Sequence, residues 1–213
     1  MIIHNVKGKI KYLFHFIYSK QVKFEFPMSI LVKYIGYEWQ LPEGYSLVSP
    51  NKDTDLREWA ELLNREGGFG IWTPERVKAE IVDHMISPDA ASLLYYKGSL
   101  VGCGSAIDQS RKGRKVGIGM WLYLEPAHRG AKGLAHAVVY RTASVFAEAG
   151  YDQFIGYTDR ERLSVLYLHL KDGCVPLYDS LSSIFKWHRI LKKLKPLLDR
   201  AEKRAQRGSQ PKI

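Results

Sequence analysis

The sequence has few of the features that mark specialised protein classes. Its 213 residues include two cysteines, Cys103 and Cys174, which exclude a disulfide scaffold and a cysteine-built zinc module. No apolar run reaches the length of about 18 residues that a membrane-spanning helix needs. The apolar run 12–18 contains His15 and no small-residue cleavage site, so we expect no signal peptide. These absences favour a reducing, cytoplasmic location.

Several motifs that carry chemistry are also missing. No Gly-x-Gly-x-x-Gly follows a predicted strand, and the phosphate-binding pattern that ends in Gly-Lys-Ser/Thr is absent. Residues 102–105 read Gly-Cys-Gly-Ser inside a strand pattern, which is not the nucleophile elbow of a hydrolase. The seven histidines show no metal-ligand spacing, so we expect no metal.

The composition is that of a folded protein with an uneven charge. Apolar residues make up 46% and charged residues 25%, while the net charge is +10. Residues 186–213 hold ten basic and two acidic side chains, whereas residues 44–185 are nearly neutral. Such a tail can attract RNA, DNA or an anionic bilayer, or it can be a solvated extension. We therefore divide the chain into residues 1–43, 44–185 and 186–213.

The pattern of apolar residues predicts alternating strands and helices from residue 45 onward. Strands joined by hairpins and followed by helical crossovers indicate a mixed α/β sheet. A basic amphipathic helix follows from residue 184, interrupted or kinked by Pro196. Residues 1–43 fit a strand pair, a dimerisation arm or a cover, so a homodimer is one option. In the core, strands are expected at 45–49, 91–96, 100–107, 116–124, 151–157 and 174–178, and helices after residues 53, 73, 133 and 160.

The segment 122–135 is the best candidate for a ligand-binding site. It reads as a strand, a loop of small residues with the cations Arg129 and Lys132, and the start of a helix. The first N–H groups of a helix lack partners, and the helix dipole adds a positive field there. The segment therefore predicts a cradle for a diphosphate, although a plain glycine-bearing turn has the same pattern.

Two motifs make the chain resemble the GNAT superfamily of acyl-CoA-dependent N-acyltransferases. Gly133-Leu134-Ala135 matches the end of the family's coenzyme A loop, and residues 126–130 match the approach to it. The chain departs from the family pattern at Arg129, which lies four residues before Gly133 instead of three, with Ala131 as a one-residue insertion. Residues 168–174 match the end of the family's last major helix, with Cys174 in place of Phe. The order of predicted elements over residues 45–178 is also similar.

The resemblance implies a mixed, mostly antiparallel central sheet, flanked by helices and splayed between the fourth and fifth core strands. It implies transfer of an acyl group, acetyl by default, from acyl-CoA to a primary amine by direct attack in a ternary complex. The strand backbone would hold the pantetheine arm. The coenzyme-binding residues it implies are Leu122, Tyr123, Leu124, Arg129, Gly130, Ala131, Lys132, Gly133, Leu134 and Ala135.

The catalytic candidates follow from the same resemblance. His169 occupies the position of the general acid that protonates the leaving thiolate, and a packing or surface histidine is the alternative. Tyr167 is its rival, but an apolar stripe indicates a core position for it. Glu125 either takes part in catalysis or ends the strand. Phe69 and Trp72 would border the acceptor pocket, or anchor an ordinary turn between helices.

A second hypothesis is a catalytically silent GNAT-like module that binds an anionic partner, nucleic acid or membrane surface, through its basic tail. No aromatic-rich nucleic-acid motif accompanies the basic residues, which disfavours this hypothesis. The sequence leaves the acceptor open among protein amines, aminoglycosides, polyamines and amino acids.

Overall fold

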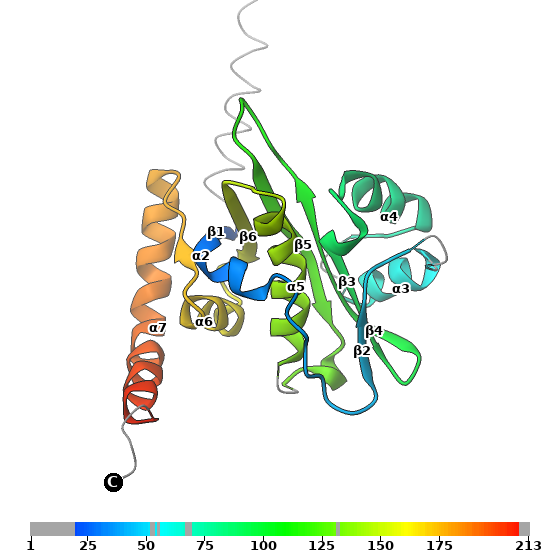
Figure 1. Cartoon of the computed structure of the whole chain (residues 1–213). Helices are drawn as coiled ribbons and strands as arrows, with labels where there is room; N and C mark the ends of the chain where they lie inside the picture. The colour runs from blue at the N-terminus through cyan, green and yellow to red at the C-terminus, as the bar shows by residue number, and fades with distance from the viewer. Residues whose placement is uncertain (1–19, 52–53, 55, 67–69, 131–132, 209–213) are drawn as a thin grey trace, which may run out of the picture. The chain divides into compact units, whose positions relative to one another are not determined.

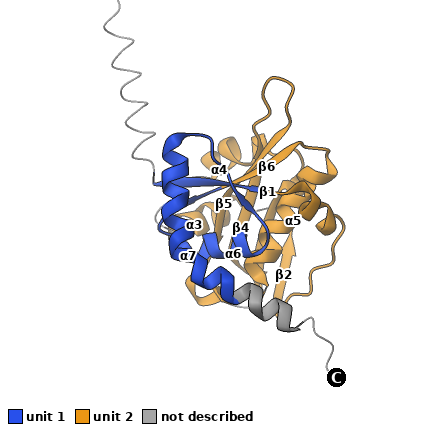
Figure 2. Ribbon diagram, turned by 90° about the vertical axis from the view of Figure 1, so that its left-hand side faces the viewer, with its two compact units in different colours: residues 1–25, 157–213 blue, residues 26–156 orange. Residues whose placement is uncertain are grey.

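The chain divides into two units, which Figure 2 draws in different colours. Unit 2 comprises residues 26–156, and unit 1 combines residues 1–25 with residues 157–213. The computed structural model describes the following residues, with side chains as far as residue 200: 20–51, 54, 56–66, 70–130 and 133–208.

Unit 2 contains a mixed sheet whose strands follow the order β2-β3-β4-β5-β6 (Figure 1). The first three pairs of neighbours are antiparallel and the pair β5–β6 is parallel. The turn Lys97-Gly98 has φ values of 48° and 86°, which is the backbone that a two-residue hairpin needs. The strands are β2 (Tyr45–Val48), β3 (Ala91–Tyr96), β4 (Ser99–Asp108), β5 (Val116–Leu124) and β6 (Gln153–Asp159), the last running on into unit 1.

Helices cover both faces of this sheet. On one face Leu93 packs with residues of α3 (Leu56–Glu66) and α4 (Pro74–Glu80). On the other face Leu94 packs with Leu134 and Val138 of α5 (Leu134–Glu148), because neighbouring strand residues point to opposite sides. Shorter segments are α2 (Met28–Leu31) and the 3₁₀ turns η1 (Val32–Tyr34), η2 (Val82–His84), η3 (Pro88–Ala90) and η4 (Pro126–His128).

Two glycines let α5 lie unusually close to the sheet. A Cβ on Gly117 would lie 2.3 Å from Cδ1 of Phe146, and one on Gly104 would lie 2.7 Å from Cγ1 of Val138. Both contacts are shorter than carbon atoms allow, so only a hydrogen fits at these strand positions. Gly104 and Gly117 are therefore packing sites for α5.

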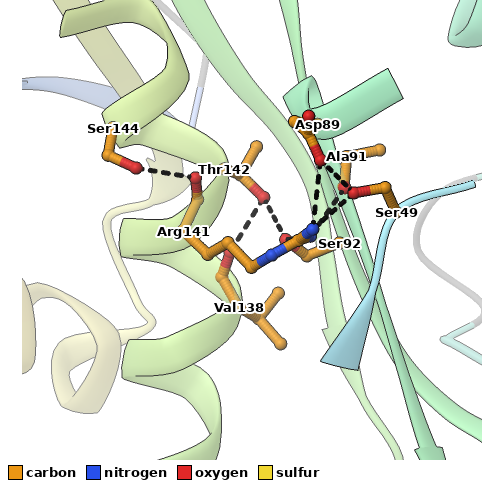
Figure 3. A network of polar contacts seen from close by, with 8 residues as sticks. All are labelled: Ser49, Asp89, Ala91, Ser92, Val138, Arg141, Thr142 and Ser144. Carbon is orange, nitrogen blue, oxygen red and sulfur yellow. Dashed lines mark hydrogen bonds and ion pairs between the residues drawn. The ribbon is translucent and has the colours of Figure 1, made fainter. Parts of the chain in front are cut away.

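A polar network fixes the side of α5 against the sheet (Figure 3). The Arg141 guanidinium donates to Ser92 Oγ at 3.1 Å and to the carbonyl of Ala91 at 3.3 Å, and it pairs with Asp89 at 3.2 Å. Thr142 Oγ1 donates to Ser92 Oγ at 2.9 Å. Because the network joins α5 to β3 and to the turn before it, it fixes the rotation of α5 about its axis.

In unit 1, a strand from the N-terminal region pairs with the last strand that the sequence predicts, at residues 174–178. β1 (Gln21–Phe26) pairs antiparallel with β7 (Val175–Pro176), so this region supplies a strand. The carbonyl of Lys23 accepts from the Trp187 indole N–H, which is buried at the inner face of α7 (Leu181–Gly208). The remaining helix is α6 (Leu163–Lys171).

Two helix boundaries in unit 1 differ from the prediction. α6 begins at Leu163 rather than near residue 160, because β6 extends to Asp159 and the N–H of Arg160 still donates to the Lys20 carbonyl at 2.8 Å. α7 begins at Leu181, where the N–H of Ser183 donates to Ser180 Oγ at 3.1 Å and caps the first turn. Its helical backbone continues past Pro196, so that residue does not end the helix.

The predicted fold class is confirmed: the sheet is mixed and mostly antiparallel, and helices flank it. In the part of the chain that the structure describes, no helix combines the length and the apolar character needed to cross a bilayer. The three segments predicted from composition do not coincide with the two units, and their boundaries remain predictions.

Candidate active site

The ladder between the fourth and fifth core strands ends early. β5 pairs with β6 from Val116 to Gly119, opposite Gln153 to Gly156. Among the described residues of unit 2, no pairing of these two strands continues beyond that point, although β5 runs on to Leu124. β6 crosses into unit 1 directly after Gly156, so the splay between the two strands remains a prediction. A strand edge that leaves its partner can accept an extended ligand as an added strand.

A bulge lies in the second half of β5, which, in the part of unit 2 that the structure describes, pairs with β4 but not with β6. Ser105 faces Met120 and Cys103 faces Tyr123, so β5 has one residue more than β4 across this interval. Trp121 carries the irregularity with a φ of 56°, a left-handed conformation that is uncommon for a bulky residue. Backbone strain of this kind concentrates at binding and catalytic sites, where it redirects peptide groups.

Two buried side chains of β4 support the bulge. Ser105 Oγ donates to the Met120 carbonyl at 3.3 Å, and Cys103 Sγ donates to the Trp121 carbonyl at 3.4 Å. Burial raises the pKa of the Cys103 thiol to about 12, so it stays protonated and keeps its donor hydrogen. Cys103 is thus a supporting residue of the bulge as well as a core thiol.

The loop after β5 leaves open space at its glycines. Gly130 and Gly133 have φ values of 83° and 86°, and a Cβ on either would meet no atom within 4 Å. The positive φ values favour glycine, and the open space leaves room for a ligand beside the backbone. The predicted site residues Ala131 and Lys132 lie between them, outside the described residues.

The start of α5 completes the candidate site. Gly133 is the N-cap and supplies no side-chain cap, and the first ladder bond runs from the N–H of Ala137 to the Gly133 carbonyl at 2.8 Å. The N–H groups of Leu134 and Ala135 precede that bond. Backbone donors, the positive end of the helix dipole and an uncrowded glycine loop together fit a diphosphate.

The strand residues predicted to hold the coenzyme point their side chains into the two cores. Tyr123 and Trp121 pack with the α3–α4 side, whereas Leu122 and Leu124 pack with the α5 side, as the predicted alternation requires. Tyr123 and Leu124 are buried, so only their backbone groups are suited to meet a ligand.

Arg129 is engaged by the protein itself. Its Nε donates to the Leu124 carbonyl at 2.8 Å, and its guanidinium lies 5.5 Å from the centre of the Tyr123 ring. These contacts fix the chain reversal after β5. They make Arg129 a support of the loop, which accords with its shifted place in the motif.

Glu125 lies in a charged cluster at the end of β5. Its carboxylate forms an ion pair with Arg65, and its second oxygen lies 4.0 Å from Nε2 of His128. Nδ1 of His128 shares a 2.7 Å hydrogen bond with the Tyr45 hydroxyl. The sequence does not reveal this cluster, because its partners are 60 and 83 residues apart and no local pattern joins them.

Trp72 is a core residue that contacts the bulge. It is 3% exposed, and its ring lies 4.8 Å from that of Trp121, edge to face. The side chain of Asn64 holds both backbone groups of Trp72, at 2.7 and 3.0 Å. These contacts favour the anchoring role over direct contact with an acceptor. Phe69, the other predicted pocket residue, lies outside the described residues.

The two predicted general acids lie on α6, in unit 1. His169 is 4% exposed and stacks on Phe24 with ring centres 4.5 Å apart, whereas Tyr167 is only partly buried. His169 thus packs in the core of unit 1, which is one of the two alternatives to a catalytic role, and it is the more buried of the two side chains. Its ring packs as an aromatic.

An aromatic cluster at the first turn of α5 was also missed. His136 shares a 3.0 Å hydrogen bond with the Tyr34 hydroxyl, and Tyr34 stacks on Trp39 with ring centres 5.4 Å apart. The ring of Trp39 lies 5.6 Å from that of His136. Tyr34 and Trp39 come from the segment before the predicted core, so the cluster has no signal within one stretch of sequence.

Solved structures share this arrangement of strands and helices. A GCN5-related N-acetyltransferase from Sphaerobacter thermophilus matches with a TM-score of 0.52 at 20% identity, over 65% of this chain and 43% of that one. The chain has the GNAT fold. An aminoglycoside acetyltransferase from an uncultured soil metagenomic sample, in complex with trehalose, gives 0.50 at 12% identity, over 63% of this chain and 90% of that one.

A Drosophila protein is also similar in structure, with a TM-score of 0.54 at 10% identity, over 74% of this chain and 47% of that one. No protein-family model and no curated protein matches the chain. The matched part is less than half of the Sphaerobacter protein, so this likeness establishes the fold and not the activity, substrates or partners of the chain.

Proposed function

We propose that the protein is an acyl-CoA-dependent N-acyltransferase, with acetyl-CoA as the default donor and a primary amine as acceptor. One observation carries the proposal: a bulged strand, whose ladder with β6 ends at Gly119, leads through an uncrowded glycine loop to the uncapped start of a helix. This arrangement suits a ligand with a long polar arm that ends in a diphosphate.

The binding role falls to backbone groups. The N–H groups of Leu134 and Ala135 would hold the diphosphate, with Gly130 and Gly133 leaving room for it. The backbone of residues 122–124 would hold the pantetheine arm as an added strand. Lys132 would add charge in the same loop. Binding through the backbone explains why the departure at Arg129 need not abolish it.

Acyl-CoA, the donor substrate, supplies an activated thioester carbonyl that an uncharged amine attacks directly. A backbone N–H beside the bulge at Trp121 would stabilise the developing negative charge on that carbonyl oxygen. The amine loses a proton to a base or to water, and the leaving sulfur gains one from a general acid.

Tyr167 and His169 remain the proposed general acids, and the structure favours testing Tyr167 first, because it is the less buried of the two. Glu125 is proposed as a base only in second place. Its ion pair with Arg65 gives it a structural role at the end of β5.

The test is an assay of free thiol released from acetyl-CoA by the purified full chain. The acceptors are a peptide with a free N-terminus, an aminoglycoside, a polyamine and an amino acid, with a no-acceptor control for hydrolysis. We expect acceptor-dependent thiol release with at least one of them. Absence of release together with no heat on titration with acetyl-CoA would contradict the proposal.

The acid is assigned by comparing Tyr167→Phe with His169→Gln. Replacement of the true acid should lower kcat and leave the dissociation constant for acetyl-CoA unchanged. Equal rates for both variants and the parent would remove both residues from that role.

A further candidate function concerns the basic C-terminal region, which the sequence suggests as the contact for an anionic partner. α7 bears six basic and one acidic side chain over residues 181–200, which favours a polyanion at this helix in addition to the acyltransfer site. A homodimer and a cytoplasmic location stay predictions.

A further inference from the structure

α7 has an inner face that is fully used within unit 1. Ser183, Trp187, Ile190 and Leu194 are all buried, and their spacing of four, three and four residues defines one side of the helix. The Trp187 indole also donates its hydrogen bond to the Lys23 carbonyl. The rotation of the helix about its own axis in unit 1 is therefore fixed.

The opposite side begins with large apolar side chains exposed to solvent. Leu181 is 76% exposed, Phe185 68% and Ile184 45%. We call these three residues the apolar end of α7. Scattered exposed apolar residues are normal, but three within two turns of one helix form a contiguous patch, which marks an interaction surface.

Basic side chains continue the same side toward the C-terminus. A helix turns by about 100° per residue, so residues seven or eleven positions apart share one side. Leu181 thus lines up with His188 and Lys192, and Phe185 lines up with Lys192. The exposed lysines and arginines between residues 188 and 195, which we call the basic stripe, are Arg189, Lys192, Lys193 and Lys195.

Little opposes the charge of the basic stripe within α7. Over residues 181–200, Asp199 is the one acidic side chain, and it lies 3.7 Å from Lys195. Asp179, just before the helix, is paired with Lys23 of β1 at 2.7 Å. The stripe therefore presents a positive surface next to an apolar one.

We propose that the outer face of α7, its apolar end together with its basic stripe, docks on an anionic lipid surface. Helices that lie in the interface of a bilayer combine these two features: apolar side chains enter the acyl boundary while lysines and arginines meet anionic headgroups. The inner face stays packed in unit 1, so docking requires no unfolding.

The chemistry of this face favours a lipid surface over a nucleic acid or a second copy of the chain. A nucleic acid would use the basic stripe and could stack a base on Phe185, but the aliphatic side chains of Leu181 and Ile184 would find no partner in it. A second copy would bring one basic stripe against another, and like charges oppose that pairing. An anionic bilayer alone satisfies both parts of the face.

The experiment is co-sedimentation of the full chain, without coenzyme, with vesicles of phosphatidylcholine alone or mixed with phosphatidylserine. We expect binding only to the mixed vesicles, weakened by salt. The double variant K192E/K193E should reduce partitioning by more than about fivefold for each charge removed. F185S should weaken binding even at low salt, where the charges act most strongly.

Two controls separate docking from loss of folding or of general surface character. Ile71 is 83% exposed in unit 2, so I71S removes an exposed apolar side chain elsewhere and should leave vesicle binding unchanged. All variants should melt within a few degrees of the parent. L181S serves as the second apolar variant if F185S melts early.

Several results would overturn the proposal. Equal binding to both vesicle types, or none to either, would do so. Binding unaffected by both F185S and L181S, accompanied by retention of RNA or DNA, would assign the face to a nucleic acid. Self-association that F185S abolishes, without vesicle binding, would assign it to a second copy. None of these results bears on acyltransfer, which the thiol-release assay measures separately.

Discussion

Replacing Gly133 by alanine should separate the coenzyme site from the stability of the fold. Gly133 has a φ of 86°, and a Cβ added to it would have no atom within 4 Å, so the new methyl group meets no clash in the protein. The left-handed backbone costs a non-glycine residue about 1–2 kcal/mol. For a chain of this size, that strain lowers the melting temperature by about 2–4 °C per kcal/mol.

The effect on binding should be larger than the effect on stability. The methyl group would occupy the space in which the diphosphate approaches the loop. Loss of one hydrogen bond to a charged phosphate costs about 1.5–3 kcal/mol. At about 1.4 kcal/mol for each factor of ten, the dissociation constant for acetyl-CoA should rise about ten- to a hundredfold.

Gly150 supplies a matched control at the other end of α5. Its φ is 68° and its surroundings are equally open, so Gly150→Ala introduces similar backbone strain away from the proposed site. Isothermal titration and thermal melting of both variants measure the two effects side by side. If the two variants lose acetyl-CoA affinity equally, or if Gly133→Ala binds as tightly as the parent, the reasoning about the loop is refuted.

Three further predictions address the packing, the bulge and the aromatic cluster. Gly117→Ala should destabilise the fold by about 1–3 kcal/mol, because its Cβ would overlap the ring of Phe146, and an unchanged midpoint in urea would contradict the close packing of α5. The raised pKa of Cys103 means that its protonated thiol contributes stability below its ordinary pKa of 9.0, which is lost as pH rises toward about 12. The melting temperature of Cys103→Ala should therefore fall less steeply than that of the parent across that pH range. Parallel curves for the two proteins would argue against a stabilising role for the protonated Cys103 thiol. Trp39→Phe should diminish the change in tryptophan fluorescence that acetyl-CoA causes, and an undiminished change would separate the aromatic cluster from the bound coenzyme.

The order of elements was predictable because local patterns determine them. Thr73 and Pro74 mark the start of α4, and the Thr73 hydroxyl does accept from the N–H of Arg76 at 3.3 Å. The glycine after Lys97 marks the β3–β4 hairpin for the same reason: only certain residues tolerate its backbone. The loop before α5 was found because its glycines follow a strand.

The bulge was not predictable, since nothing in the run around Trp121 signals a left-handed residue. Its conformation depends on donors from Ser105 and Cys103, which pairing with β4 brings near. The cluster of Glu125, Arg65 and His128 is likewise a product of tertiary structure. Long-range contacts of this kind leave no trace in the spacing of residues along one segment.

The burial of His169 shows what helical periodicity alone cannot decide. The stripe of leucines on α6 placed Tyr167 on the packed side, but Phe24 of β1 supplies a second apolar surface for His169. The sequence could not reveal this, because the N-terminal strand pairs with β7, about 150 residues further along the chain.

The central claim is that the start of α5 binds the diphosphate of an acyl-CoA. The most direct measurement is a titration of the ¹⁵N-labelled protein with acetyl-CoA, followed through the backbone amide resonances of Leu134 and Ala135. The account predicts large, saturable shifts at these amides and at residues 122–124, with little change at Gly150. Saturable binding that leaves the first amides of α5 unmoved would contradict it.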